Sequence, residues 1–238
     1  MIGVILAAGK GSRLGSYTVD QPKSLLPLNS HGTLLDYNLR VLKEIGIEKI
    51  LIVAGFSAEK IQHHVRTFEN IQVIYNPFWY LCNVLGSLYM ALPYLKDDFL
   101  FLHADTLVDV AIWKKLVAHP GEIVFPYVSK ACGNEEMKVR HDENGRLIEV
   151  SKTMPNEWAS GEFLGIAKFT ASTVPMLRDT SVHLFSTGRL DFYMEAAVQD
   201  LIEKGLCEVQ TFDIGTAPFV EVDFEEDYRY AREVFAQK

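Results

Sequence analysis

The residues with the clearest chemical potential stand near the start of the chain. Residues 6–14 read Leu-Ala-Ala-Gly-Lys-Gly-Ser-Arg-Leu, and residues 22–27 read Pro-Lys-Ser-Leu-Leu-Pro. The first segment leaves an apolar run that predicts a buried strand, and its small residues let backbone N–H groups approach a polyphosphate. Arg13 and Lys23 are cations that can balance the charge of a triphosphate held by those amides. The two segments together predict a triphosphate site.

Three other interpretations of Gly9 and Gly11 are considered. Gly9 and Gly11 alone are equally consistent with a plain turn between a strand and a helix. A P-loop is excluded, because Val4 stands where its first glycine is needed and Gly11 where its serine or threonine is needed. A dinucleotide-binding fingerprint that starts at Gly9 lacks its last small residue, because Leu14 stands there. A nicotinamide-dependent oxidoreductase is therefore only a weak alternative.

Acidic residues farther along the chain are candidate metal ligands. Asp105 directly follows the apolar run 99–104, at the carboxyl end of a predicted strand, where parallel sheets bind their ligands. Glu221 and Asp223 alternate along a second short apolar strand, so both side chains face the same side. Mg²⁺ prefers carboxylate oxygens and bridges nucleotide phosphates, so Mg²⁺ is the predicted cofactor. Asp105 could instead cap a helix or stabilise a turn.

The elements that must position these groups alternate along the first half of the chain. The predicted strands cover 2–6, 49–54, 71–76, 99–103 and 122–127, and the predicted helices cover 34–45, 57–67, 86–92 and 110–118. This alternation predicts an α/β fold with a mixed, mostly parallel sheet and helices on both faces. The later segments 137–141, 147–151 and 163–169 predict a small antiparallel ribbon region.

Composition restricts the possible partners. The chain has 238 residues, 48% of them hydrophobic, and no linker or repeat interrupts it, so we expect one domain over residues 1–238. A formal net charge of −8 argues against nucleic acids and anionic membranes as partners. No apolar run approaches the roughly 20 residues that span a bilayer.

The N-terminus shows no targeting signal and the three cysteines show no pairing pattern, so cytoplasmic localisation is expected. Oligomeric state is not fixed, and a homodimer stays open.

The two opening motifs resemble those of nucleotidyltransferases that activate phosphorylated small molecules, which begin with similar Leu-Ala-Ala-Gly-x-Gly-x-Arg-Leu and Pro-Lys-x-Leu-Leu-Pro sequences. The resemblance implies a single Rossmann-like domain of the nucleotide-diphospho-sugar transferase type. It implies catalytic roles for Arg13 and Lys23, and Asp105 and Asp223 match the family's metal-binding positions. Phe224-Glu225 stands where relatives carry Thr-Pro. The loop residues expected to bind the nucleotide are Leu6, Ala7, Ala8, Gly9 and Gly11.

Residues 76–91 point to one nucleotide. The segment from Asn83 to Leu88 resembles the Asn-x-x-x-Ser-Leu helix start of the cytidylyltransferase branch, which includes choline-phosphate and 2-aminoethylphosphonate enzymes. Glucose-1-phosphate members carry a Gln- and Gly-Thr-rich loop there, so the resemblance implies CTP. Asn83 and Ser87 offer amide and hydroxyl groups that can pair with cytosine. They could instead simply cap the helix that follows.

The resemblance also suggests where the second substrate binds. It places Lys152 at the phosphate of the acceptor or of the nucleotide, as a third catalytic cation, and Lys138 is a weaker candidate that could simply protect a strand edge. An acceptor that ends in an ammonium group would be held by aromatic rings and carboxylates. Some of these aromatic residues could equally be core. The candidate acceptor-binding residues are Lys138, Trp158, Glu162, Asp191, Phe192, Tyr193 and Glu195.

These features predict a magnesium-dependent cytidylyltransferase. In this reaction an anionic oxygen of a small phosphorylated or phosphonate acceptor attacks the α-phosphorus of CTP and pyrophosphate leaves, so no general base is required. The alternatives are a sugar-1-phosphate uridylyl- or thymidylyltransferase and a non-catalytic nucleotide-binding protein. A binder needs no metal at the α-phosphate, so the paired cations and carboxylates disfavour it. The acceptor stays open among phosphocholine, phosphoethanolamine, 2-aminoethylphosphonate and other small phosphorylated amines.

Overall fold

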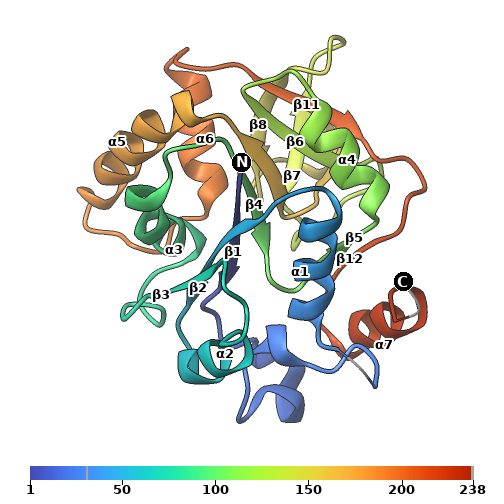
Figure 1. The fold of residues 1–238 in the computed structure, drawn as a ribbon. Helices are drawn as coiled ribbons and strands as arrows, with labels where there is room; N and C mark the ends of the chain where they lie inside the picture. The colour runs from blue at the N-terminus through green and yellow to red at the C-terminus, as the bar shows by residue number, and fades with distance from the viewer. Residues whose placement is uncertain (31, 237–238) are drawn as a thin grey trace.

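A computed structural model describes residues 1–30 and 32–236 (Figure 1). Its central feature is a ten-stranded mixed sheet, in the order β3-β2-β1-β4-β10-β6-β9-β7-β8, with β11 paired to β6. The strands are β1 (Ile2–Ala7), β2 (Lys49–Ala54), β3 (Ile71–Tyr75), β4 (Phe99–His103), β6 (Ile123–Val128), β7 (Lys138–His141), β8 (Leu147–Ser151), β9 (Gly161–Phe163), β10 (Ile166–Phe169) and β11 (Val209–Asp213). β1 to β4 are parallel to one another, whereas β10 runs antiparallel to β4 and β6.

Helices cover both faces of this sheet (Figure 1). They are α1 (Leu34–Glu44), α2 (Ala58–His64), α3 (Val84–Ala91), α4 (Val110–Ala118), α5 (Val174–Phe185), α6 (Met194–Glu203) and α7 (Glu225–Val234). Side chains alternate along each strand, so Leu100 and Leu102 of β4 enter one hydrophobic core and Phe99 and Phe101 enter the other. The first core includes residues of α1, α2, α4 and α7, and the second includes residues of α3, α5 and α6.

The predicted α/β class is confirmed, and β2, β4 and α4 have the predicted bounds. The antiparallel strands β7, β8 and β9 extend the main sheet rather than forming a region apart from it. A separate two-stranded antiparallel sheet joins β5 (Thr106–Val108) to β12 (Phe219–Glu221). Within the described residues, no helix has both the length and the apolar character that crossing a membrane requires.

Two predicted helix boundaries are wrong by more than one residue, each for a local reason. The helix predicted from residue 86 begins at Val84, because the Asn83 side chain accepts a hydrogen bond of 2.8 Å from the Val84 N–H and caps the helix. The helix predicted over 57–67 ends at His64, where the chain turns at Val65. Both differences are changes of one turn or less, and neither alters the order of the elements.

The strand predicted over 163–169 is divided into β9 and β10, and Gly165 lies at the break. This glycine has a φ of +70°, and a Cβ there would lie 2.9 Å from His103 Nδ1 and 3.0 Å from Thr106 Oγ1. Gly165 therefore lets the backbone pass close to the residues that follow β4. Its backbone oxygen accepts a hydrogen bond of 3.0 Å from the His103 N–H, which fixes the end of that strand.

We expect Gly165→Ala to lower the free energy of unfolding by about 3 kcal/mol, because it combines a left-handed backbone with overpacking. Gly188→Ala is the matched control. Gly188 also has a positive φ, +83°, but no atom lies within 4 Å of its ideal Cβ position. Gly188→Ala should therefore lower the free energy of unfolding by only about 1 kcal/mol, which is the effect of a left-handed backbone on alanine. Urea unfolding of both variants measures the difference, and equal losses would contradict the close approach at Gly165.

Candidate active site

The glycine-rich loop lies at the carboxyl end of β1, beside the end of β4. Leu6 pairs with His103 in the parallel ladder, so both strands deliver their following residues to the same edge. Gly11 has a φ of +69°, and its Cβ position lies 3.0 Å from the Lys23 side chain, so only glycine fits comfortably there. The loop encloses a cavity of about 130 Å³. Its lining residues are Leu6, Ala7, Gly9, Gly11, Lys23, Ser24, Ala104 and Asp105.

Lys23 joins two carboxylates from distant parts of the chain. Its Nζ lies 2.6 Å from Asp105 Oδ2 and 2.7 Å from Asp223 Oδ1, and the Lys23 side chain is 10% exposed. Asp105 directly precedes β5, and Asp223 follows β12, which pairs with β5. The Val222 N–H also donates to the Asp105 carbonyl oxygen at 3.1 Å. The pairing of these short strands therefore brings the predicted cation and two predicted metal ligands together.

The electrostatics of this cluster favour its charged forms. Burial by itself would lower the pKa of Lys23, but the charges of Asp105 and Asp223 outweigh it and raise the pKa above its usual value. For Asp105, burial by itself would raise the pKa, but the Lys23 and His103 charges lower the pKa below its usual value. Lys23 and Asp105 therefore stay ionised at neutral pH.

Arg13 contacts the same group of acids from the loop side. Its guanidinium donates to Asp223 Oδ2 at 3.0 Å, so the two oxygens of Asp223 are held by Arg13 and Lys23. A second guanidinium nitrogen lies 3.5 Å from Glu135. About half of the Arg13 side chain is exposed to solvent, which leaves it able to reach a bound phosphate. The structure thus places both predicted loop cations beside Asp223.

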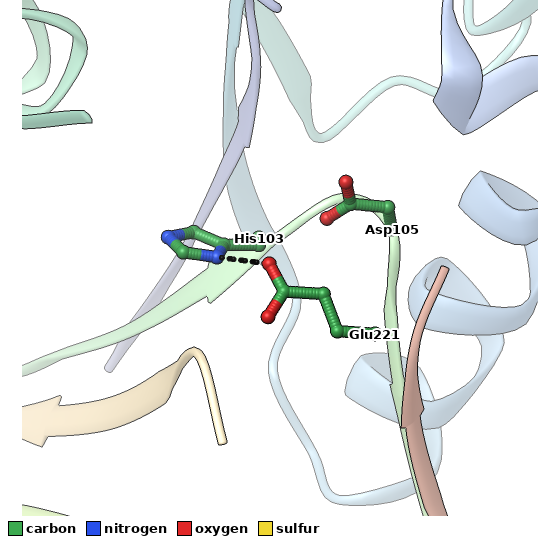
Figure 2. Close-up of side chains that lie close together, drawn as sticks. All are labelled: His103, Asp105 and Glu221. Atoms are coloured by element: carbon green, nitrogen blue, oxygen red, sulfur yellow. Dashed lines mark hydrogen bonds and ion pairs between the residues drawn. The ribbon is translucent and has the colours of Figure 1, made fainter. Parts of the chain in front are cut away.

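Three side chains near this cluster lie close enough to share one ion. Ligand atoms of His103, Asp105 and Glu221 all lie within 4.8 Å of one another. Figure 2 shows the carboxylates of Asp105 and Glu221 pointing into the same space, with the His103 ring beside Glu221. Oxygen donors of this kind suit Mg²⁺, and Asp223 reaches the neighbouring Lys23 ammonium. Asp105 and Glu221 therefore lie close enough to hold one divalent cation, whereas Asp223 is outside this group and meets Asp105 at the Lys23 ammonium.

His103 takes part as a charged hydrogen-bonding group. Its Nδ1 lies 3.3 Å from Glu221 Oε1 (Figure 2). Burial lowers the pKa of His103, but the hydrogen bond and charge of Glu221 more than compensate and raise the pKa to about 9. In this form His103 donates its Nδ1 proton to Glu221, and the oxygen donors are the ligands that suit Mg²⁺.

A larger cavity of about 420 Å³ opens next to these residues. Seven of the predicted site residues line it: Arg13, Glu221 and Asp223 of the cluster described above, and Lys152, Glu162, Tyr193 and Glu195 on the acceptor side. Lys152 lies with its Nζ 5.0 Å from the centre of the Tyr193 ring. The other lining residues are His103, Lys130, Glu135, Glu136, Met137, Phe163, Gly165, Phe219, Val220, Phe224, Asp227 and Tyr230.

Four predicted acceptor-binding residues do not line this cavity, and one of them is Phe192, whose ring centre lies 5.0 Å from the Arg189 guanidinium. Lys138 is buried, and its Nζ donates to the Gly133 carbonyl oxygen at 2.9 Å. Trp158 is exposed on the surface, beside the Arg140 guanidinium. Asp191 is exposed and accepts two hydrogen bonds of 3.0 Å from Arg189. Each of these side chains is therefore engaged in a local contact of its own.

The two predicted base-contacting residues also have local partners. Asn83 caps α3, as the alternative interpretation expected. The Ser87 hydroxyl is buried and accepts a hydrogen bond of 3.1 Å from Asn76 Nδ2. Asn76 Oδ1 in turn accepts from the Phe78 N–H at 2.9 Å. These bonds fix the loop before α3, and contact with a base stays a prediction.

Other residues of the cavity escaped the sequence interpretation. Lys130 Nζ lies 2.8 Å from Glu162 and 3.3 Å from Glu136, and Glu135 contacts Arg13. All three new residues come from the segment between β6 and β7, which has no periodicity that predicts a structure. The charged residues Glu135, Glu136 and Lys138 are a possible signal in the sequence. Their positions in the cavity depend on the conformation of a loop, which the sequence pattern does not predict.

Glu195 is the most unusual titratable group of the cavity. It lies in the first turn of α6, is 2% exposed, and its Oε2 is buried without a hydrogen-bond partner. Burial raises the pKa of Glu195 above its usual value, although the charges of His103 and Lys152 oppose the shift. The folded protein therefore binds this proton more tightly than the unfolded chain does, so ionisation of Glu195 makes folding less favourable as pH rises.

We expect Glu195→Gln to raise the melting temperature at pH 7 to 8, because it removes a buried charge. The gain should shrink as pH falls toward about 4, where the unfolded chain also holds the proton. Thermal unfolding of the two proteins between these pH values measures the effect. A constant difference across the range, or a loss of stability at neutral pH, would contradict it.

Known proteins resemble this chain in sequence and in fold. Residues 3–160 match the MobA-like NTP transferase domain. Choline-phosphate cytidylyltransferase of Streptococcus pneumoniae is 24% identical, with 98% of each chain covered. CTP:phosphoglutamine cytidylyltransferase of Campylobacter jejuni is 24% identical over 86% of this chain and 89% of its own. The solved structure of the CTP:phosphocholine cytidylyltransferase from S. pneumoniae superposes with a TM-score of 0.80 at 21% identity, covering 98% of both chains, and shares the fold.

Proposed function

This chain belongs to the MobA-like NTP transferase domain family and is a nucleotidyltransferase, and from that premise we propose that it is a magnesium-dependent cytidylyltransferase. In the proposed reaction, an oxygen of a small phosphate or phosphonate acceptor forms a bond to the α-phosphorus of CTP. The bond from that phosphorus to the bridging oxygen of the β-phosphate breaks, and pyrophosphate leaves with the electron pair. The acceptor oxygen is already anionic at neutral pH, so no proton has to be removed.

The observation that carries this proposal is the position of Lys23 between Asp105 and Asp223. Two carboxylates from distant segments converge on one cation at the edge of the glycine-loop cavity. A binding protein needs donors for the phosphates, but it does not need paired carboxylates at the same place. The cluster instead suits a reaction in which charge builds on an α-phosphate and on a leaving pyrophosphate.

The roles of the residues follow from their positions. Backbone N–H groups of residues 8–11 would hold the triphosphate, and Arg13 and Lys23 would balance its charge. Lys152, which lines the larger cavity, would hold the phosphate of the acceptor. Mg²⁺, when bound, would be held by Asp105, Glu221 and Asp223 and would supply further charge neutralisation. These groups bring two anions together that otherwise repel.

The choice of CTP rests on the relatives and on the sequence before α3. Both curated relatives described above are named as cytidylyltransferases. Asn83 and Ser87 are proposed to lie near the base, with Asn76 holding the Ser87 hydroxyl in place. The sugar-1-phosphate uridylyl- or thymidylyltransferase alternative is tested by the same turnover screen.

The test is a turnover screen with pyrophosphate release as the readout. CTP, UTP, dTTP and ATP are each incubated with phosphocholine, phosphoethanolamine, 2-aminoethylphosphonate and glucose 1-phosphate, with Mg²⁺ or with EDTA. We expect release with CTP and an amine-bearing acceptor, in Mg²⁺ only. Turnover of glucose 1-phosphate with UTP or dTTP would replace the proposal with the alternative. CTP binding without turnover of any acceptor would indicate a non-catalytic protein.

A further inference from the structure

We propose that the acceptor carries a primary ammonium group at the end opposite its phosphate, and that Glu195 accepts a hydrogen bond from it. This inference rests on the proposed function and narrows its substrate class. It excludes a trimethylammonium group and an uncharged hydroxyl group as the preferred end. The argument depends on the charges of the larger cavity, on their pairing and on the rings that line it.

The charge of the cavity favours a cationic substrate end, because carboxylates outnumber lysine and arginine side chains in the lining even when Glu221 and Asp223 are assigned to Mg²⁺. Its lining includes seven carboxylate side chains and only three from lysine or arginine, together with His103. A phosphate monoester that enters this cavity brings about two more negative charges at neutral pH. A compact cation at the other end of the same molecule offsets part of that repulsion. A zwitterionic acceptor therefore suits this cavity better than a purely anionic one.

The pairing of these charges locates the two ends. Arg13 is paired with Asp223 and Glu135, Lys130 with Glu136 and Glu162, and His103 with Glu221. Asp227 accepts from the backbone N–H groups of Asp223 and Phe224. Among the described residues, the charged groups of the lining that have no ion pair are thus Lys152, Glu195 and this capping aspartate. Lys152 and Glu195 offer one free cation and one free carboxylate, the complement of a zwitterion.

Glu195 needs a donor rather than only a countercharge. Its Oε2 is buried without a hydrogen bond, and an unsatisfied buried acceptor is costly unless a ligand supplies the missing partner. Lys152 and Glu195 line the same cavity, and the Lys152 ammonium lies 5.0 Å from the centre of the ring of Tyr193, two residues before Glu195. A primary ammonium brings three N–H donors and a positive charge. A trimethylammonium group brings the charge alone and leaves Oε2 without a donor.

The aromatic residues do not form a free cage for a quaternary cation. The Lys152 ammonium lies over the Tyr193 ring, and the Arg13 guanidinium lies over the Phe224 ring, 5.7 Å from its centroid. The Phe163 ring stacks on Phe125 at a centroid distance of 4.4 Å. A trimethylammonium group is recognised by several ring faces around it. Among the described residues of the lining, only the Phe219 and Tyr230 rings have no ring or cation partner, and two rings do not surround a quaternary cation. The hydrogen-bonding route through Glu195 is therefore favoured.

A hydroxyl-bearing acceptor is the competing interpretation. His103 Nε2 is a second buried atom without a partner in this lining, and a hydroxyl group could bridge it to Glu195. Such an acceptor would not offset the excess of carboxylates. The two interpretations differ in the charge of the acceptor group that contacts Glu195. Acceptors of equal length that differ only in this group can therefore separate them.

The first experiment compares three acceptors of equal length on the unmodified protein: phosphoethanolamine, phosphocholine and 2-hydroxyethyl phosphate. With CTP and Mg²⁺, we expect kcat/KM for phosphoethanolamine to exceed both others by about 10- to 100-fold, the range of a hydrogen bond to a charged group. Equal or better turnover of phosphocholine or of 2-hydroxyethyl phosphate would overturn this inference and leave the cytidylyltransferase proposal intact. Turnover of none of the three, nor of 2-aminoethylphosphonate, would instead count against the proposed function.

The second experiment uses Glu195→Gln, which keeps the shape of the side chain and removes its charge. We expect the preference for phosphoethanolamine over 2-hydroxyethyl phosphate to fall to about threefold or less, mostly through KM. Calorimetric titration with phosphoethanolamine should show a matching loss of affinity. Glu203→Gln on the same helix, at an exposed position where Glu203 accepts from Gln199, is the control that should retain the preference. An unchanged preference in Glu195→Gln would overturn the assignment.

Discussion

Asp105→Asn is expected to lower turnover with CTP by about 1,000-fold, or about 4 kcal/mol of transition-state stabilisation. The carboxylate is one of two that hold the Lys23 ammonium, and it shares space with Glu221. Asparagine keeps the size of the side chain but loses the negative charge that a divalent cation needs. The measurement is steady-state pyrophosphate release over a range of Mg²⁺ concentrations, and the loss should persist at saturating Mg²⁺.

Asp98→Asn provides a matched control for this substitution. Asp98 lies at the amino end of β4, whereas Asp105 follows its carboxyl end, and Asp98 Oδ1 accepts a hydrogen bond of 2.8 Å from the Ala171 N–H. We expect turnover within about twofold of the original protein, because an asparagine oxygen can accept the same bond. If Asp105→Asn also retained such turnover, the carboxylate would have no part in the chemistry.

The parts of the fold that sequence predicts are those whose local pattern and burial agree. The parallel strands are continuous apolar runs, because both of their faces are covered, and β2 and β4 have their predicted bounds. The break at Gly165 was not predicted, because its cause is the approach of the backbone to His103 at the end of β4 and to Thr106 at the start of β5. Contacts between distant segments of this kind leave no local pattern.

The candidate site shows the same division. Residues at the carboxyl ends of β1 and β4 lie together, as strand order predicts, so the loop and Asp105 are neighbours. The sequence also predicts Lys23 and Asp223 as functional residues, but not that Lys23 holds both carboxylates. That contact depends on the pairing of β5 with β12, two strands of three residues each, which are too short for periodicity to predict.

The acceptor side was the hardest part to predict. Glu195 and Tyr193 line the cavity as expected, whereas Asp191, only a few residues away, is exposed and paired with Arg189. The three residues stand at the start of α6, where the chain changes direction, so small differences in sequence position become large differences in orientation. Lys130 was missed because a loop conformation, rather than a strand or a helix, brings it to Glu162.

Lys23→Met is expected to reduce turnover by about 1,000-fold and also to change how the protein responds to Mg²⁺ alone. The ammonium holds Asp105 and Asp223 together, and its removal leaves two partly buried carboxylates without their shared cation. Without Mg²⁺, the free energy of unfolding should fall by about 3 kcal/mol. Mg²⁺ should restore part of that loss, because a cation that binds only the folded state stabilises it.

The Mg²⁺ response separates this explanation from simple damage to the fold. In a thermal unfolding titration without nucleotide, Mg²⁺ should raise the melting temperature of Lys23→Met by several degrees more than that of the original protein. Lys152→Met is the control, because its ammonium contacts the Tyr193 ring and makes no ion pair with either carboxylate within the described residues. That variant should respond to Mg²⁺ as the original protein does. An identical response in all three proteins would show that Lys23 and the divalent cation do not share the two carboxylates.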